Sequence, residues 1–375
     1  MNSSNVKKVL YTFCELILMM ILYAILDNIG GIKKYVFVLG ISFFYLIIGR
    51  KKQWSIESVL CIVIPVVAYI VLGSLSALLS VNAQTSAVKV ILFWIVPVFF
   101  AFSLYIYYGE RMNHIVDVQF LGSCLAYKLF DAPITFGIYT WESVYSFTFG
   151  MFGIYYLYKK RWGMFLAAVF FVWLAEKRIG LLAIVIISAI RFFLWLFQEN
   201  KKLIYTLWGL CIGAAFSYVY LIYSGIMEAF CWGANINTSG RVEMYTKMAQ
   251  EFEFSPLFFG EGLGIVEKLL EYWRVSVFQN LHNDLLKFYI ELGFIGLLLF
   301  LLSYGVSFFF IEKRFGKLAM GFAFVTAIYS VLLYATDNVS IYMIYLIPFY
   351  STIFAVLASE KKCDAKEKID VKENN

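Results

Sequence analysis

Two arginines and one histidine are the residues of this chain whose types and positions suit chemistry on a phosphate-bearing substrate. The first, Arg178, lies in the run Leu174-Ala-Glu-Lys-Arg-Ile-Gly, where three charges separate two apolar stretches with almost no linker. Charge so close to hydrocarbon normally faces a protein interior or a water-filled cavity, and it therefore indicates a functional site. The alternative is a short hairpin whose Lys177 and Arg178 side chains extend to the lipid headgroups.

The second arginine, Arg241, follows Asn237-Thr-Ser-Gly in a polar segment. Thr238 or Ser239 is suited to cap a helix that begins here, which places Arg241 in the first turn. The N–H groups of a helix start, together with a guanidinium, form a natural phosphate site. A cation near a helix N-terminus is otherwise unfavourable, which favours a bound anion. The alternative is an interfacial helix with a solvated arginine.

His282 stands where this polar segment gives way to the next apolar stretch, in Leu281-His-Asn-Asp. An imidazole has an ordinary pKa suited to accepting a proton near neutrality. Asn283 or Asp284 is placed to cap the following helix. A single histidine in a loop is also commonly structural, so the functional interpretation depends on its combination with the two arginines.

The elements that must position these residues are membrane-spanning helices. The chain is 62% hydrophobic and 15% charged, with a mean hydropathy of +0.78, whereas soluble domains are roughly half apolar and about a quarter charged. We expect an all-α polytopic integral membrane protein with about twelve transmembrane helices (10–12), since each span needs roughly 20 apolar residues. The expected spans are 10–26, 35–49, 56–79, 87–108, 117–135, 143–158, 163–176, 179–197, 203–224, 285–311, 317–335 and 339–358.

The domain organisation follows from these spans. Residues 1–358 are expected to form a single transmembrane domain, which includes one large extracytoplasmic loop, 225–284, with short helices of its own. Residues 359–375 form a charged tail that we expect to be cytoplasmic and disordered. The first apolar stretch resembles a signal peptide but is followed by no small-residue cleavage site, so it is interpreted as a retained helix.

Orientation follows from the positive-inside rule. With both termini in the cytoplasm, the cytoplasmic loops contain most of the basic residues: Arg50, Lys51, Lys52, Arg111, Lys159, Lys160, Arg161, Lys201, Lys202, Lys313, Arg314 and Lys317. The opposite loops, 80–86, 131–142 and 336–338, contain no Lys or Arg, and only Lys33 and Lys34 contradict the scheme strongly. Arg178, Arg241 and His282 then share the outer face. Such a set suits a phosphate-rich head and a hydroxyl to be activated, as in a polyprenyl-pyrophosphate-linked sugar.

Other classes of partner and cofactor are not supported by the sequence. The net charge of +6 resides in short loops, which is typical of topology determinants rather than of a nucleic-acid-binding surface. The six cysteines are scattered without metal-ligand spacing, and only two histidines are present. Gly260, Gly262 and Gly264 do not have the spacing of a dinucleotide fingerprint and are interpreted as turn residues. We therefore expect no cofactor and no metal.

With these motifs in place, the segment from Arg178 to Phe300 resembles the family of O-antigen ligases and Wzy-type polysaccharide polymerases. The resemblance rests on an Arg at a helix break, Ser239-Gly240-Arg241, the glycine turn at 260–264, His282-Asn283, and Glu291-Leu-Gly293-Phe-Ile-Gly296. The first element reads Lys-Arg where Ser-Arg is expected. The resemblance implies metal-independent glycosyl transfer from undecaprenyl pyrophosphate at the outer face of the bacterial inner (plasma) membrane, in O-antigen, capsule or exopolysaccharide synthesis.

The resemblance also implies roles for individual residues. Arg178 and Arg241 are expected to hold the pyrophosphate, and His282 to deprotonate or orient the acceptor hydroxyl. Further substrate-binding candidates are Ser239, Gly240, Asn283, Glu291, Tyr245 and Trp273. A structural role for Glu291 is an open alternative, and an interfacial belt explains Tyr245 and Trp273 equally well.

Three functions are weighed from the sequence. A repeat-unit polymerase is preferred, working beside a flippase and a chain-length regulator on lipid-linked oligosaccharide. A ligase, which transfers the glycan to lipid A-core or a wall polymer, shares the same motif. A flippase or other transporter is less favoured, because no internal repeat is visible and the key charges gather on one face.

Overall fold

The computed structural model describes residues 3–29, 31–49, 56–80, 86–131, 142–236, 238, 240–273 and 281–373. Every regular element in these residues is helical, as the composition predicts. The longer helices are α1 (Ser3–Asn28), α2 (Lys33–Gly49), α3 (Ile56–Leu79), α4 (Ser86–Tyr108), α5 (Met112–Ala126), α6 (Tyr145–Tyr158), α7 (Trp162–Leu174), α8 (Arg178–Leu196), α9 (Lys201–Tyr223), α13 (Asp284–Tyr334) and α14 (Met343–Glu373).

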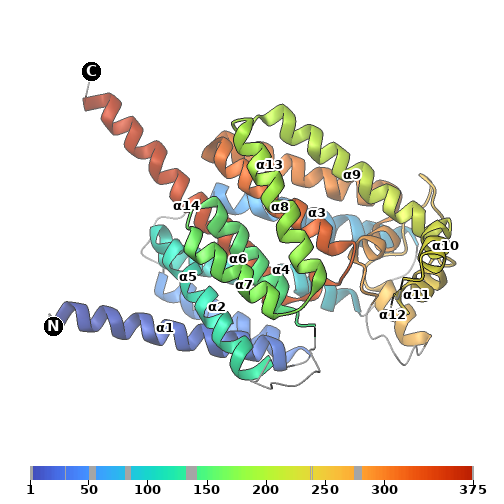
Figure 1. Ribbon diagram of the computed structural model, residues 1–375, viewed down its shortest axis with the longest axis horizontal. Coiled ribbons are helices and arrows are strands. Elements are labelled where there is room, and N and C mark those ends of the chain that lie inside the picture. The colour runs from blue at the N-terminus through green and yellow to red at the C-terminus, as the bar shows by residue number, and fades with distance from the viewer. Residues whose placement is uncertain are drawn as a thin grey trace.

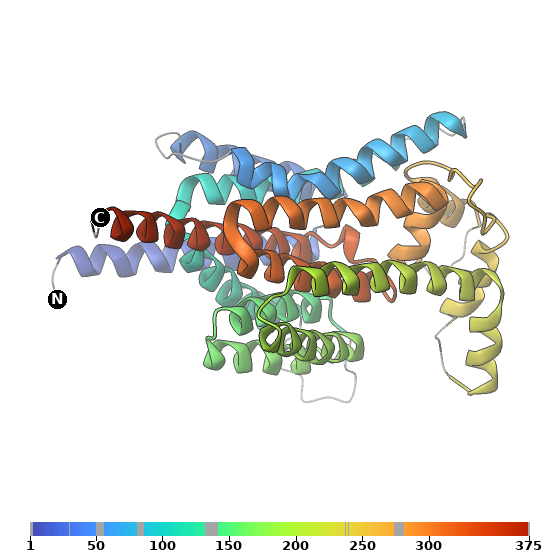
Figure 2. The ribbon, with the colours of Figure 1, turned by 90° about the horizontal axis from the view of Figure 1, so that it is seen from above.

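The helices follow the spans expected from hydropathy, with breaks at the expected places. The short 3-10 segment η1 (Gly109–Arg111) separates α4 from α5. Gly316 has left-handed φ and extended ψ, and it interrupts α13 between the expected spans 285–311 and 317–335. Figure 2 shows α13 doubling back partway along its length. The charged tail differs from the expectation, because α14 extends as a helix to Glu373; its many Lys and Glu residues have high helix propensity.

Seven helices of the described residues are long and apolar enough to cross a membrane, which makes the chain consistent with a polytopic membrane protein. They are Val9–Asn28, Val59–Leu79, Ser86–Asp131, Arg178–Leu196, Lys201–Tyr223, Asp284–Tyr334 and Met343–Glu360. α2, α6 and α7 contain 17, 14 and 13 residues, fewer than the roughly 20 that a perpendicular crossing needs. The twelve spans therefore stay a prediction.

Between α9 and α13 the chain forms three short helices, α10 (Ile226–Gly233), α11 (Arg241–Met248) and α12 (Ile265–Tyr272). Figures 1 and 2 place these helices at one end of the bundle and both chain termini at the other. The segment expected to form the large loop thus lies opposite the termini. Which end faces the cytoplasm stays a prediction from the charges.

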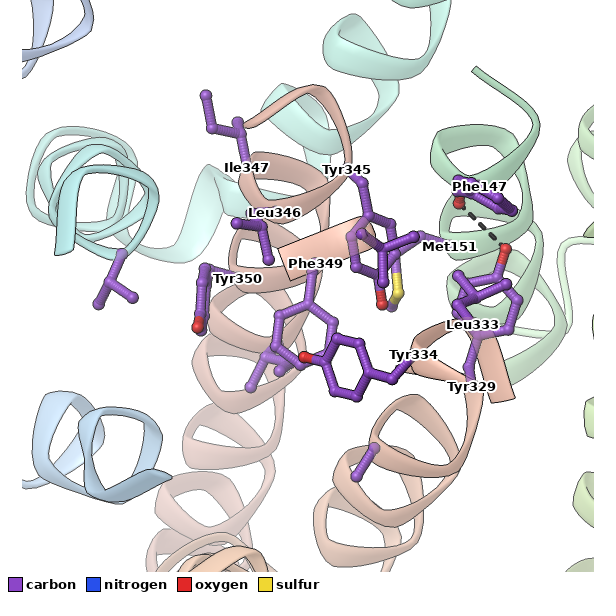
Figure 3. Packing of buried hydrophobic residues seen from close by; sticks show 14 of the residues in the cluster. Phe147, Met151, Tyr329, Leu333, Tyr334, Tyr345, Leu346, Ile347, Phe349 and Tyr350 are labelled. Atoms are coloured by element: carbon purple, nitrogen blue, oxygen red, sulfur yellow. Dashed lines mark hydrogen bonds between the residues drawn. The ribbon is translucent and has the colours of Figure 1, made fainter. Parts of the chain in front are cut away.

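The interior of the bundle is rich in tyrosine, and several of the buried hydroxyls join neighbouring helices. The Tyr329 hydroxyl donates to the Phe147 carbonyl at 3.1 Å, which joins α13 to α6 (Figure 3). The hydroxyls of Tyr345 and Ser330 lie 2.7 Å apart, which joins α14 to α13. A buried hydroxyl without a partner destabilises a fold, so these bonds fix the relative positions of the helices.

The glycine turn at 260–264 packs directly on a break in α13. The Phe294 amide donates to the Phe258 carbonyl at 2.9 Å, and the Glu261 amide donates to the Ile290 carbonyl at 2.8 Å. Gly293 has a φ of 75° there, and a Cβ at this position would lie 2.3 Å from the Phe258 oxygen. Only glycine permits both the backbone conformation and the close approach.

We expect Gly293→Ala to lower the free energy of unfolding by at least about 2 kcal/mol, because it adds left-handed strain to a backbone clash. The matched control is Gly209→Ala in the middle of α9, where a Cβ meets nothing within 4 Å. That change should leave stability unchanged or raise it by about 0.5–1 kcal/mol. Thermal unfolding of both purified variants in detergent measures the difference, and equal midpoints would contradict this account of the turn.

Candidate active site

Arg178 and Arg241 line one pocket of about 360 Å³, although they come from distant parts of the sequence. Lys177, Tyr218, Tyr245 and Thr336 contribute further polar groups to its wall. The pocket lies between the α7–α8 junction, the short helices that follow α9, and the connection between α13 and α14. The arginines that the sequence places on one face are thus brought to one cavity.

The helix break places Arg178 as the first residue of α8. α7 ends at Leu174, Glu176 takes a left-handed φ of 54°, and Lys177 is the extended N-cap. Such a reversal turns the chain back without a linker, as the sequence predicts. The Arg178 guanidinium therefore begins a 19-residue helix whose first N–H groups have no partner within the helix.

Arg241 is likewise the first residue of a helix, α11, but the cap differs from the prediction. Gly240 occupies the N-cap in a left-handed conformation, with φ 77°, and among the described residues no side chain caps the helix. Thr238 instead accepts a bond from the Arg241 amide through its carbonyl, at 3.1 Å; Ser239 lies outside the described residues. The Arg241 guanidinium donates to the Thr336 carbonyl at 3.3 Å, which directs it toward the α13–α14 connection.

That connection contains a buried carboxylate, Asp337, on which the site is organised. Lys177 Nζ lies 2.5 Å from Asp337 Oδ2, and His282 Nδ1 lies 3.3 Å from Oδ1. The Tyr342 hydroxyl and the Asn338 amide also donate to Oδ1, at 3.1 and 2.8 Å. Burial alone raises the pKa of Asp337, but the bond from His282 and the Lys177 ammonium outweigh it and hold this pKa below its ordinary value. The carboxylate is therefore ionised at neutral pH.

His282 receives its orientation from this carboxylate and from Tyr245. An ionised Asp337 only accepts, so the contact fixes the imidazole proton on Nδ1 and leaves Nε2 as the basic nitrogen. The Tyr245 hydroxyl donates to the His282 carbonyl at 2.8 Å. Burial raises the pKa of Tyr245, which keeps this donor protonated. His282 itself has a φ of 52°, and its side chain is 25% exposed, so the ring is within reach of solvent.

Asn283 and Asp284 attach the start of α13 to the neighbouring elements. Asn283 is the N-cap, accepting from the Leu286 amide at 3.0 Å, and its Nδ2 donates to the Tyr218 hydroxyl at 3.2 Å. The Asp284 carboxylate accepts from both the amide and the hydroxyl of Ser340, each at 2.7 Å. The cap predicted from Asn283 is present, and it sets the position of His282 beside it.

Four predicted substrate-binding residues do not line this pocket, and neither does His282. Gly240 lines a neighbouring cavity, Asn283 caps α13, and Glu291 and Trp273 lie elsewhere. Glu291 is fully buried, and its carboxylate accepts from the Tyr69 hydroxyl at 2.5 Å and from the Gly264 amide at 2.8 Å. This carboxylate anchors the glycine turn, which corresponds to the structural alternative left open for it. Trp273 lies under the Lys247 ammonium, 4.6 Å from the ring centre. Neither residue lines the pocket, whereas Tyr245 does.

Sequence reasoning missed Asp337, Lys177 as its partner, and Tyr218. A signal for Asp337 was present, because it is an isolated acidic residue between two apolar stretches, 317–335 and 339–358. The cost of burying such a charge, which drew attention to Arg178, applies equally to this carboxylate. Its partners are distant in sequence, so the pairing itself could not be inferred.

A comparison with protein families identifies residues 163–301 as similar to the O-antigen ligase family. The resemblance to the O-antigen ligase and Wzy-type family that the motifs indicate is therefore confirmed over this segment, which contains Arg178, Arg241 and His282. No curated protein and no solved structure is significantly similar to the chain.

We expect Lys177→Met to lower the free energy of unfolding by about 3 kcal/mol, because it leaves the buried Asp337 carboxylate without its cation. The matched control is Lys201→Met, in which the lysine is 58% exposed and lies 3.7 Å from Glu312. An exposed pair of this kind contributes at most about 1 kcal/mol. Unfolding in detergent at neutral pH measures both variants, and equal losses would show that the Lys177–Asp337 contact does not hold the site together.

Proposed function

We propose that this chain is a polysaccharide repeat-unit polymerase that transfers a growing glycan from undecaprenyl pyrophosphate to a hydroxyl of an incoming lipid-linked repeat unit. The reaction would take place at the outer face of the bacterial inner (plasma) membrane. The observation that carries the proposal is that Arg178 and Arg241, each the first residue of its helix, line one pocket. The family match adds a glycosyltransferase-like activity on lipid-linked polysaccharide.

The two arginines suit the departing pyrophosphate. When the bond between the anomeric carbon and the phosphate oxygen breaks, the electron pair leaves with the undecaprenyl pyrophosphate, and negative charge grows on its oxygens. Guanidinium groups donate to phosphate oxygens in pairs and remain charged at every relevant pH. Since both arginines stand at helix starts, the positive ends of the helix dipoles add to the stabilisation. We propose that these groups supply the charge without a metal ion.

His282 suits the acceptor side of the reaction. The acceptor hydroxyl oxygen forms the new bond to the anomeric carbon, and its proton passes to Nε2 of His282. The imidazolium that results is stabilised by the ionised Asp337, 3.3 Å from Nδ1. The Lys177 ammonium partly neutralises the negative charge of Asp337, and its contact with Oδ2 holds the carboxylate in place. Asp337 is therefore proposed as a positioning residue and His282 as the base.

A ligase is the second candidate, because the family description itself is that of an O-antigen ligase. The donor, the departing group and the base are the same in both reactions. The two differ in whether the acceptor is another lipid-linked repeat unit or a finished surface structure such as lipid A-core. We prefer the polymerase, which would act beside a flippase and a chain-length regulator.

We expect Arg178→Ala, Arg241→Ala and His282→Ala each to reduce glycan transfer by about 100-fold or more, because each removes a group that acts on developing charge. Arg111→Ala is the matched control, since Arg111 is an exposed arginine in η1, outside the pocket. Polymer length in cells and transfer by purified protein on a lipid-linked oligosaccharide are the measurements. Long glycan polymers in all three variants, at a normal protein level, would contradict the assignment.

The acceptor is identified by the glycan pattern of a deletion strain. For a polymerase we expect single repeat units on the final acceptor, because ligation continues without elongation. For a ligase the acceptor would be unmodified, and lipid-linked polymer would accumulate. Gel electrophoresis of surface glycan alongside extracted lipid-linked material separates the two outcomes, with the Arg111→Ala strain as the reference for normal length.

A further inference from the structure

A second cavity lies at the opposite end of α8 from the arginine pocket. It has a volume of about 370 Å³ and is lined by Leu157, Lys160, Trp162, Ser188, Arg191, Phe192 and Trp195. Arg178 begins α8 and Trp195 is near its end, so the two sites are separated by about 26 Å at 1.5 Å per residue. A bilayer core is about 30 Å thick, which places the two cavities near opposite interfaces.

The lining of this groove combines an apolar wall with one net positive charge. Trp162, Phe192 and Trp195 are more than half exposed within it. Arg191 is paired with Glu199, and its guanidinium lies over the Tyr158 ring. That pair is close to neutral. Lys160 is exposed and forms no ion pair with any of the described side chains, so it supplies the net charge.

Two apolar helix faces lead away from the groove. On α7, Trp162, Leu166, Phe170 and Trp173 recur at helical spacing, and each is more than half exposed. On α8, Leu182, Val185 and Phe192 also recur at helical spacing, and they are 54%, 65% and 59% exposed. α7 and α8 lie side by side in the bundle (Figure 1). Such surfaces are stable only against hydrocarbon, so the groove opens onto lipid.

We propose that this groove binds an anionic glycerophospholipid, with its phosphodiester at Lys160 and its acyl chains along the exposed faces of α7 and α8. The single net charge matches that of one phosphodiester, and the tryptophans suit the interface between headgroups and chains. The polyprenyl donor is not the occupant, because its phosphates would lie a full membrane thickness from Arg178 and Arg241. The α7–α8 hairpin carries Lys177 and Arg178 at its other end, so a lipid here steadies the element that presents Arg178.

The test measures lipid binding by the purified, delipidated full-length protein with native mass spectrometry. Phosphatidylglycerol and phosphatidylcholine with identical chains are compared. We expect phosphatidylglycerol to bind the first site about 5–10-fold more tightly, and Lys160→Gln to abolish this preference. Lys202→Gln is the matched control, because it removes an exposed lysine at the same end outside the groove. Ser188→Leu, which fills the groove without changing charge, should weaken binding of both lipids several-fold.

Three results would overturn the proposal: equal affinity for the two lipids, equal effects of Lys160→Gln and Lys202→Gln, or displacement of phosphatidylglycerol by a lower concentration of undecaprenyl phosphate. A thermal midpoint for each variant shows whether it folds. A second readout is the midpoint itself, which phosphatidylglycerol should raise in the parent protein and in Lys202→Gln but not in Lys160→Gln. Neither readout depends on the catalytic assignment, so this inference and the proposed function fail separately.

Discussion

A buried carboxylate must be compensated where it lies, and that constraint organises the end of the bundle that contains the arginine pocket. Asp337 is held between the Lys177 ammonium and the His282 imidazole, and it also accepts from Tyr342 and from the Asn338 amide. These partners come from the start of α8, the start of α13 and the connection before α14. One charge thus joins three elements that hydrophobic packing alone would position only loosely, because nonpolar contacts have little directional preference.

The same end of the molecule is built from helix starts. Arg178, Arg241 and Asp284 are the first residues of α8, α11 and α13, respectively. The positive ends of three helix dipoles therefore lie in one region, which favours negative charge there. Glu291 of α13 accepts from the Gly264 amide, the last glycine of the glycine turn, and from the Tyr69 hydroxyl of α3. A buried carboxylate outside the pocket thus attaches the glycine turn to α3 and α13.

Hydropathy and turn chemistry predicted much of this arrangement. The expected span 179–197 corresponds to α8 at Arg178–Leu196, and Gly316 divides α13 where two spans were expected. Such features are local, because a run of apolar residues and a charge cluster are visible in the sequence itself. Non-local pairing was not predictable. Asp337 and Glu291 are both isolated acids near apolar stretches. Only the fold shows that Asp337 pairs with Lys177 in the wall of the two-arginine pocket, while Glu291 anchors a turn.

The choice between polymerase and ligase depends on parts of the site that the shared motifs do not determine. In the proposed mechanism the arginines act on the donor and His282 accepts the proton, and both reactions have these steps in common. Acceptor discrimination must then come from the remaining walls, where Met227 and Cys231 of α10 face the pocket. A neighbouring cavity of about 320 Å³ shares Cys231 and adds Trp232 and Glu243. Specificity is the difference between the affinities for two acceptors. We therefore expect the shape of this α10–α11 surface to determine whether the site prefers the sugar of a repeat unit or a lipid A-core.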